Sequence, residues 1–175
     1  DVSHHQAVRA LLDVVAAFRT AYTRQIVEHL KPAGVLAQED SQGNPHAVPL
    51  PAQFLKSAAA GLNGVDIGLI GMAPLNESNT PLTEAESEAL IKLSGRHDQR
   101  VIVFSDGDYV KGIAADLAIS QSCLDCHNTH PNARWTRFQL WDLMGGIIVR
   151  LKPTSTGESV LLGPALPDRS RATER

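Results

Sequence analysis

The sequence predicts an α+β domain, in which a long N-terminal helix precedes a small, mostly antiparallel sheet with two or three short helices. Three observations lead to this prediction. The N-terminal segment repeats apolar side chains at helical spacing, later segments are strand-like, and two of these are joined by an Asp-Gly-Asp turn typical of a hairpin. With 175 residues, 43% of them apolar, the chain is long enough for one domain with a buried core.

Residues 3–31 are expected to form one amphipathic helix, roughly 40 Å long at about 1.5 Å per residue. Ser3 is a suitable N-cap, and Pro32 followed by Gly34 ends the helix. The apolar residues at i+3 and i+4 spacing are Val8, Leu11, Leu12, Val15, Phe18, Tyr22 and Ile26.

The middle of the chain predicts shorter elements separated by turn formers. A short helix is expected over 52–60 and a strand over 65–71. A long loop follows, and Thr83 with Glu86 three residues later forms a capping box that opens the next helix.

The C-terminal half predicts the rest of the sheet. Residues 100–105 and 109–120 are the two strands of the hairpin, and 145–152 is the final strand. We therefore expect the domain to span residues 1–152. Residues 153–175, rich in Pro, Ser, Thr and charged side chains, are expected to be a polar tail or linker.

Composition excludes several classes of protein. A net charge of −3 and no stripe of Lys and Arg argue against nucleic-acid binding. No apolar run approaches the length of about 18 residues that a membrane span needs. No basic and apolar leader opens the chain, so we expect any signal peptide or anchor to have been removed. Two cysteines are too few for a disulfide framework.

Both cysteines lie in one C-x-x-C-H motif, which is typical of covalent haem attachment. Two thioethers hold the haem vinyl groups from one short helical turn, and the next residue then lies beneath the iron. Neutral imidazole is a good iron ligand. The motif therefore predicts Cys123 and Cys126 as attachment residues and His127 as the proximal iron ligand.

Three other interpretations of the motif stay open. A zinc site would use Cys123 and Cys126 with His127 or His130, but closed zinc sites usually draw a second ligand pair from a distant segment, and no such pair is evident. A thioredoxin-like dithiol calls for a nearby βαβ pattern, which is lacking here. Five residues with two wildcards can also match by chance.

Longer stretches support the haem interpretation, because the chain resembles a bacterial family of single-haem c-type sensor domains with a PAS-like fold. This family occurs alone or at the extracytoplasmic end of histidine kinases, cyclases and chemoreceptors. The matching stretches are "VPLPAQFL" (48–55), "APLNESNTPLTEAESEAL" (73–90), "GIAADLAISQSCLDCHNTHPNARW" (112–135) and "WDLMGGIIVRL" (141–151).

The resemblance implies one covalently attached haem c, held against a PAS-like sheet by Cys123, Cys126 and His127. It implies a periplasmic or otherwise extracytoplasmic location, with an anchor conceivable before residue 1. The expected function is redox or ligand sensing for a signalling output protein, and a small diatomic molecule is one candidate ligand. We also expect that the protein can form a homodimer through the N-terminal helix. The alternative is a small electron-transfer cytochrome c with a redox partner. Enzyme activity is not expected, although weak peroxidase-like activity is not excluded.

The sixth iron ligand does not follow from the resemblance, since in that family it varies and can be a cysteine, and this chain has no third one. His29 is the first choice, because steps of about 100° place Tyr22, Ile26 and His29 within roughly 40° of Val15 on the apolar face. The macrodipole alone would also favour a histidine at a helix C-terminus. The rivals are His46, Met72 and Met144, and a vacant or water-filled sixth position is the further alternative.

Four more residues are tentative haem contacts. Trp135 and Trp141 flank the motif and are expected to pack on the macrocycle, though tryptophans in a core need no function. Arg134 and Arg137 are expected to pair with haem propionates, with Lys111 as a further candidate, because arginine binds carboxylates in a bidentate manner. Exposed cations would be the ordinary alternative.

Overall fold

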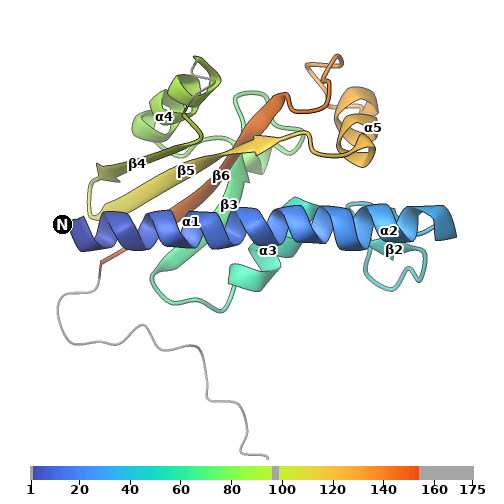
Figure 1. Ribbon diagram of the computed structural model, residues 1–175, viewed down its shortest axis with the longest axis horizontal. Coiled ribbons are helices and arrows are strands. Elements are labelled where there is room, and N and C mark those ends of the chain that lie inside the picture. Colours follow the sequence, from blue (N-terminus) through green and yellow to red (C-terminus); the bar gives the residue numbers. More distant parts are fainter. Residues whose placement is uncertain (1, 96–98, 154–175) are drawn as a thin grey trace, which may run out of the picture.

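The computed structural model describes residues 2–95 and 99–153, and it begins with the long helix that the sequence predicts (Figure 1). The α-helix α1 (Val2–Tyr22) continues through a π-helical turn, η1 (Thr23–Val27), into α2 (Glu28–Leu30) and a 3₁₀ turn, η2 (Lys31–Ala33). Gly34, with φ of 79°, ends this helical segment as predicted. Ser3 lies inside α1, so its prediction as an N-cap is wrong.

Four antiparallel strands of the described residues form the main sheet, in the order β3-β6-β5-β4. They are β3 (Val65–Ile70), β4 (Val101–Asp106), β5 (Tyr109–Leu117) and β6 (Leu143–Leu151). The hairpin prediction is confirmed, because β4 pairs with β5 up to Asp106 and Tyr109. The second hairpin strand is shorter than expected, because the chain leaves the sheet after Leu117.

Shorter elements connect and cover the sheet. They are α3 (Pro51–Ala59), the 3₁₀ turn η3 (Glu77–Asn79), α4 (Glu84–Gly95) and α5 (Gln121–Thr129). A short parallel pair, β1 (Leu36–Ala37) with β2 (Ala47–Val48), was not predicted. No helix in the described residues is long and apolar enough to cross a bilayer. The predicted α+β class is confirmed, whereas the predicted tail lies outside the described residues except for residue 153.

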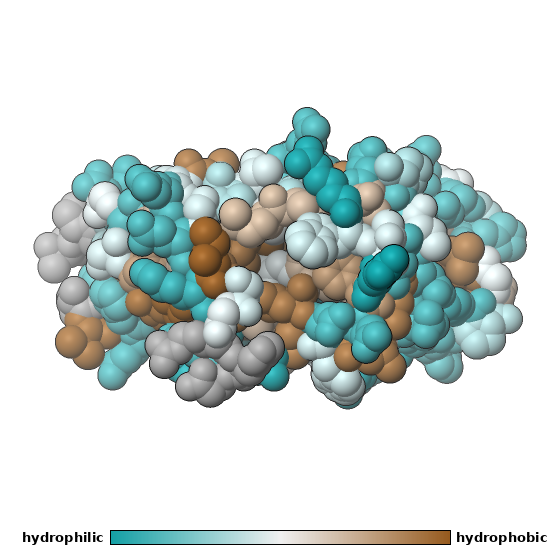
Figure 2. Space-filling model, turned by 90° about the horizontal axis from the view of Figure 1, so that it is seen from above, coloured by the Kyte–Doolittle hydropathy of each residue, from teal (hydrophilic) through white to brown (hydrophobic). Residues whose placement is uncertain are grey.

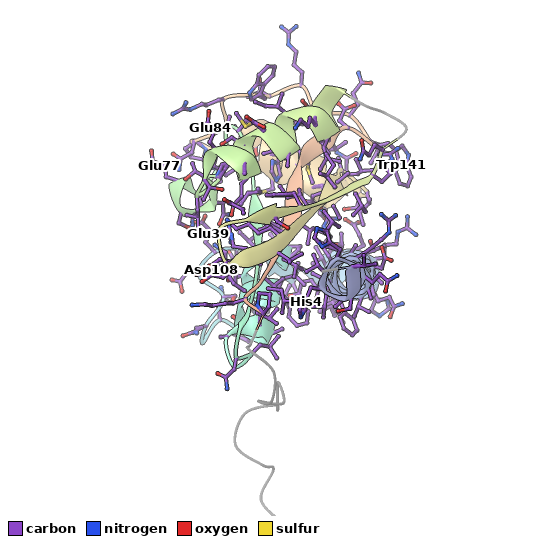
Figure 3. The ribbon with its side chains drawn as sticks, turned by 90° about the vertical axis from the view of Figure 1, so that its left-hand side faces the viewer. His4, Glu39, Glu77, Glu84, Asp108 and Trp141 are labelled. Atoms are coloured by element: carbon purple, nitrogen blue, oxygen red, sulfur yellow. The ribbon has the colours of Figure 1, made fainter. Side chains whose placement is uncertain are left out.

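The helices α1 and α3 cover one face of the sheet and α4 covers the other (Figures 1 and 3). A separate apolar core lies on each face. Under α1, Val8 and Leu12 pack on β5, where Gly112 leaves room for them. A Cβ atom at Gly112 would lie 2.6 Å from Leu12 Cδ1 and 2.7 Å from Val8 Cγ1, so a side chain here would push the helix away. Ile113, the next residue of β5, faces the core under α4.

A buried ion cluster fastens α4 to the sheet. Glu86 is fully buried and accepts hydrogen bonds from Arg150 Nε (2.7 Å) and Nη2 (2.8 Å) and from Lys111 Nζ (2.8 Å). Lys111 also pairs with Asp106 Oδ2 at 2.7 Å. Lys111 is therefore engaged on the α4 face, and its prediction as a propionate partner is wrong. Half of the predicted capping box is present, since the backbone N–H of Glu86 donates to the Thr83 hydroxyl (3.3 Å), whereas the Glu86 carboxylate accepts from the Leu82 N–H and from the cluster cations.

The π-helical turn changes which side of the long helix is buried. Up to Tyr22 the buried positions follow the predicted stripe, except that Arg19 is buried while Phe18 is 61% exposed. A π turn holds one residue more than an α-helical turn. Beyond it, each side chain therefore takes the direction that the preceding residue would have in an uninterrupted α-helix. Val27 is consequently buried in place of Ile26.

The same rotation overturns the expectation for His29. Its side chain is exposed, so the prediction that it faces the body of the domain is wrong. His29 would lie on the buried face, as expected for an iron ligand, only if the α-helical spacing were uninterrupted, and the π turn interrupts it.

Candidate functional site

The cysteine motif lies on α5, which begins where the chain leaves β5. Cys123, Cys126 and His127 occupy positions i, i+3 and i+4, so they share one face of this helix. All three side chains are half-buried, and both thiols, which lie in the described part of the chain, are free. The structure thus brings together the three residues that the motif singled out.

Cys123 faces a buried ion pair that the sequence analysis missed. Its Sγ lies 3.9 Å from Arg19 Nη2 and 3.3 Å from Ser120 Oγ. Arg19 Nε is 2.8 Å from Asp116 Oδ1, and both side chains are about nine-tenths buried or more, at 5% and 6% exposure. The sequence could have indicated that Arg19 is buried, because its helical spacing places it between Val15 and Tyr22 on the apolar face.

His127 lies against an aromatic ring from the loop that precedes β6. The rings of His127 and Phe138 meet edge to face, with centroids 5.7 Å apart. Asn128 holds that loop to α5, because it donates to the Phe138 carbonyl (3.0 Å) and accepts from the Phe138 N–H (2.9 Å). Burial lowers the pKa of His127, and the charges of Arg19 and His130 lower it further. Neutral imidazole, the form that binds metals, is therefore favoured.

Cys126 differs from the reactive cysteine of a redox dithiol. Burial raises the pKa of its thiol, and the neighbouring Cys123 and Glu39 raise it further. A thiol with a raised pKa supplies little thiolate, which is the nucleophile in disulfide exchange. The environment of Cys126 thus disfavours the dithiol interpretation.

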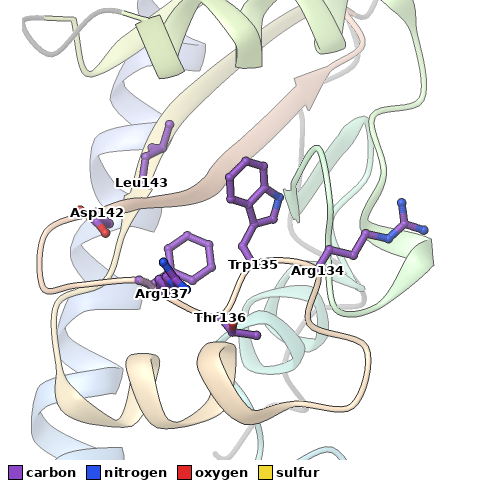
Figure 4. Close-up of a pocket in the computed structure, with 7 residues that line it drawn as sticks. Arg134, Trp135, Thr136, Arg137, Asp142 and Leu143 are labelled. Atoms are coloured by element: carbon purple, nitrogen blue, oxygen red, sulfur yellow. The ribbon is translucent and has the colours of Figure 1, made fainter.

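A hollow of about 430 Å³ opens beside this helix, a size typical of small-molecule sites (Figure 4). Its lining consists of Arg134, Trp135, Thr136, Arg137, Phe138, Asp142 and Leu143. Three of the tentative haem contacts, Arg134, Trp135 and Arg137, therefore share one cavity. Phe138 lies between this hollow and His127.

Trp141 does not line the hollow, but it holds the same loop in place. Its φ is 75°, and its backbone N–H donates to the Ala118 carbonyl at 2.8 Å. Trp135, Leu140 and Trp141 are 69%, 48% and 59% exposed, so this loop presents an apolar surface next to the motif. Apolar atoms also lie between polar side chains on the face that carries α4 and α5 (Figure 2).

These residues fit a covalently held haem. Two thiols and a neutral imidazole share one helical face, and a hollow with both polar and apolar lining and exposed aromatic rings lie beside them. Two guanidinium groups in that lining are available for carboxylates. Within residues 2–95 and 99–153, no three His, Cys, Asp or Glu side chains form a group that could hold a metal ion.

The remaining candidates for a sixth ligand differ in burial. His46 is exposed in the β1–β2 connection, and Met72 is 58% exposed. Met144 is half-buried in β6, at a bulge where Asp116 pairs with Gly145 and Leu117 with Leu143. Met144 is therefore the least exposed of these rivals, and it lies at an irregularity near the start of β6.

The fold and the site together define a class of α+β domains in which a helix carrying C-x-x-C-H leads from one central strand of an antiparallel sheet towards the next. More particularly, the chain belongs to the Tll0287-like family, whose family model matches residues 2–151. It is similar to the crystal structure of the cyanobacterial heme-protein Tll0287, with a TM-score of 0.60 and 17% sequence identity. The similarity covers 87% of this chain and 96% of that one. No curated protein matches the chain.

Proposed function

We propose that this protein is an extracytoplasmic domain that binds one haem c, with thioether bonds to Cys123 and Cys126 and with His127 as the proximal iron ligand. The observation that carries the proposal is the position of these three side chains on one face of α5, beside a hollow lined by aromatic and cationic side chains. The similarity to a crystallised heme-protein supports it. The extracytoplasmic location follows from the proposed attachment, because c-type haem is attached outside the cytoplasm in bacteria.

Each surrounding side chain has a part in this proposal. Phe138 restricts the ring of His127, which its lowered pKa keeps neutral and ready to bind iron. Trp135 and Trp141 pack on the porphyrin, and Arg134 and Arg137 bind the propionates. The haem supplies one-electron chemistry or ligand binding at the iron when it is bound.

We propose a sensor rather than an enzyme, with a PAS-like arrangement of the sheet and a signalling output protein as partner. The exposed Val14 and Phe18 on α1 support a homodimer through this helix. The second candidate is an electron-transfer cytochrome. The exposed Trp135, Leu140 and Trp141 favour it, since they offer a redox partner an apolar contact beside the haem segment.

The test is expression in a bacterial periplasm with the cytochrome c maturation machinery. The protein should retain haem after denaturation, and its mass should increase by that of one haem. The double variant Cys123→Ala/Cys126→Ala should lose covalent haem, whereas Asp125→Ala, a change at an exposed position between the cysteines, should retain it. Stoichiometric zinc without haem would show that the proposal is wrong.

Optical spectra of the ferric, ferrous and CO-treated ferrous protein separate the two functions. A low-spin spectrum unchanged by CO indicates a protein sixth ligand and favours electron transfer or redox sensing. A CO-binding iron favours a sensor of a diatomic ligand. Met144→Ala should convert the low-spin spectrum if Met144 is the sixth ligand, and His29→Ala should leave it unchanged.

A further inference from the structure

The Arg19–Asp116 pair is unusual because it places two charges in a helix–sheet interface that is otherwise apolar. Arg19 is 4% exposed and Asp116 is 5% exposed. Removing a charged pair from water costs more free energy than burying an apolar pair of the same size. A buried ion pair is therefore weak evidence that the pair stabilises the fold. The contact is also imperfect, since Arg19 Nε–H has no well-directed hydrogen-bond acceptor among the described residues. Packing alone therefore does not account for this arginine.

The pair is directed at the candidate haem site rather than at solvent. Arg19 extends beyond Asp116 so that Nη2 lies 3.9 Å from Cys123 Sγ, the atom that would bond to the edge of the haem. Thr23, 1% exposed, donates its hydroxyl to the Arg19 carbonyl at the start of the π turn. Because Asp116 holds the guanidinium from the sheet side, the positive end of the pair faces α5 and the negative end faces away from it.

We propose that Arg19, held in place by Asp116, is the charge that raises the reduction potential of the haem. This inference rests on the proposed function. Reduction adds one electron, supplied by a redox partner or a chemical reductant, and converts ferric to ferrous iron without breaking a bond. The haem thereby loses one positive charge, so a fixed cation at its edge favours the ferrous state, while the more distant Asp116 weakens that effect.

Arg19 and Asp116 are both withdrawn from solvent, at 4% and 5% exposure. Burial raises the pKa of Asp116, and Arg19 opposes this increase, which agrees with a pair that is isolated from solvent. Further charged groups near α5 include Glu28, Lys31 and Asp125 at its outer side, Glu39 near Cys126 and His130 at its C-terminus, while Arg134 and Arg137 line the neighbouring hollow.

The experiment is an optical redox titration of the haem-loaded protein at pH 7. Arg19→Gln should lower the ferrous-to-ferric ratio at a fixed potential by about tenfold, which is about 59 mV for one electron. Asp116→Asn should shift the potential in the opposite direction, because it leaves the arginine charge uncompensated. Arg19→Lys should retain most of the wild-type potential. Arg9→Gln, which removes an exposed charge from the same helix, should leave it unchanged.

Opposite shifts distinguish an electrostatic role from a structural one, since a distorted site would displace the potential in the same direction in both variants. Equal potentials for Arg19→Gln and Arg9→Gln would overturn the inference. If Arg19→Gln does not fold, a potential for Asp116→Asn at or below the wild-type value would overturn it as well. Absence of covalent haem in the wild-type protein would refute the proposed function and this inference with it, whereas haem with an unmoved potential would refute the inference alone.

Discussion

Replacing Glu86 by glutamine should destabilise the domain by about 2–3 kcal/mol at pH 7, because it removes the charge at the centre of the buried cluster. Glutamine keeps the shape of the side chain but offers one oxygen where Glu86 offers two. Arg150 and Lys111 would keep Asp66 and Asp106 as partners, but at position 86 they would share a single neutral acceptor. Three charge-assisted hydrogen bonds of 2.7–2.8 Å depend on the carboxylate.

The magnitude follows from the pKa of Glu86. Burial alone would raise this pKa, but the hydrogen bonds from Arg150 and Lys111 outweigh it and lower the value from 4.5 to about 2. A shift of this size corresponds to roughly 3 kcal/mol of stability. The expected loss is smaller, about 2–3 kcal/mol, because Lys111 and Arg150 keep Asp106 and Asp66 as partners and solvent reaches these two carboxylates at the edge of the cluster.

The pH dependence has a definite sign. A folded-state pKa below the unfolded value stabilises the protein above about pH 4.5, and this contribution disappears as the pH falls towards about 2. The free energies of unfolding of the wild type and Glu86→Gln should therefore differ at pH 7 and converge near pH 2–3.

Urea denaturation followed by circular dichroism at pH 7, 5 and 3 measures both effects. The matched control is Glu88→Gln on the same helix, where the side chain is 60% exposed and lies 3.6 Å from Lys92. This control should change stability by less than about 0.5 kcal/mol. Equal stabilities of the two variants at pH 7 would show that the cluster does not hold α4 on the sheet.

Three further outcomes follow from the structure. Gly112→Ala should destabilise the domain by about 1–3 kcal/mol in denaturant titrations, since α1 leaves no room for a methyl group, whereas Gly61→Ala, with open space around it, should not. In the haem-free protein, Trp141→Gly should change the free energy of unfolding by less than about 1 kcal/mol, because relief of the left-handed backbone offsets the freedom that glycine adds to the unfolded chain; a larger loss would mean that the ring is packed. In the haem-free protein, NMR titration should give His127 a pKa below 6.5, and a value above 6.5 would contradict its burial beside Arg19.

Local patterns were sufficient to predict most of the fold. The strands were recognisable from short apolar runs, and the start of α4 from the spacing of Thr83 and Glu86, because these signals depend on near neighbours in the chain. The shared face of Cys123, Cys126 and His127 followed from helical spacing in the same way. Each of these features is decided within a few residues.

The features that were missed depend on contacts between distant segments. Arg19 meets Cys123 across 104 residues, and Arg150 meets Glu86 across 64, so neither partner was visible from spacing. The π turn is one inserted residue, which no change in composition marks, and it was enough to turn His29 outward. Register along a helix is therefore the least secure step when a ligand is assigned from sequence.

The contacts of the long helix also bear on how the proposed site could communicate. Its first half packs on β5 at Gly112, while its second half touches α5 at three points. One is the contact between Arg19 and Cys123, already described. The other two are Glu28 Oε1, which accepts from the Ser122 N–H (3.1 Å), and Lys31, which pairs with Asp125 (2.8 Å).

The contact at Ser122 matters most for that link. Ser122 lies in the first turn of α5, where free N–H groups and the positive end of the helix dipole favour a carboxylate. The long helix thus supplies the cap that Ser120 does not provide by its own side chain. A displacement of α5 on reduction or ligand binding would act on these three contacts at once, and the rigid helix would transmit it to the face that carries Val14 and Phe18. In the proposed sensor these contacts would couple the haem segment to the exposed face of the long helix, whereas in a carrier they would only hold α5 in place.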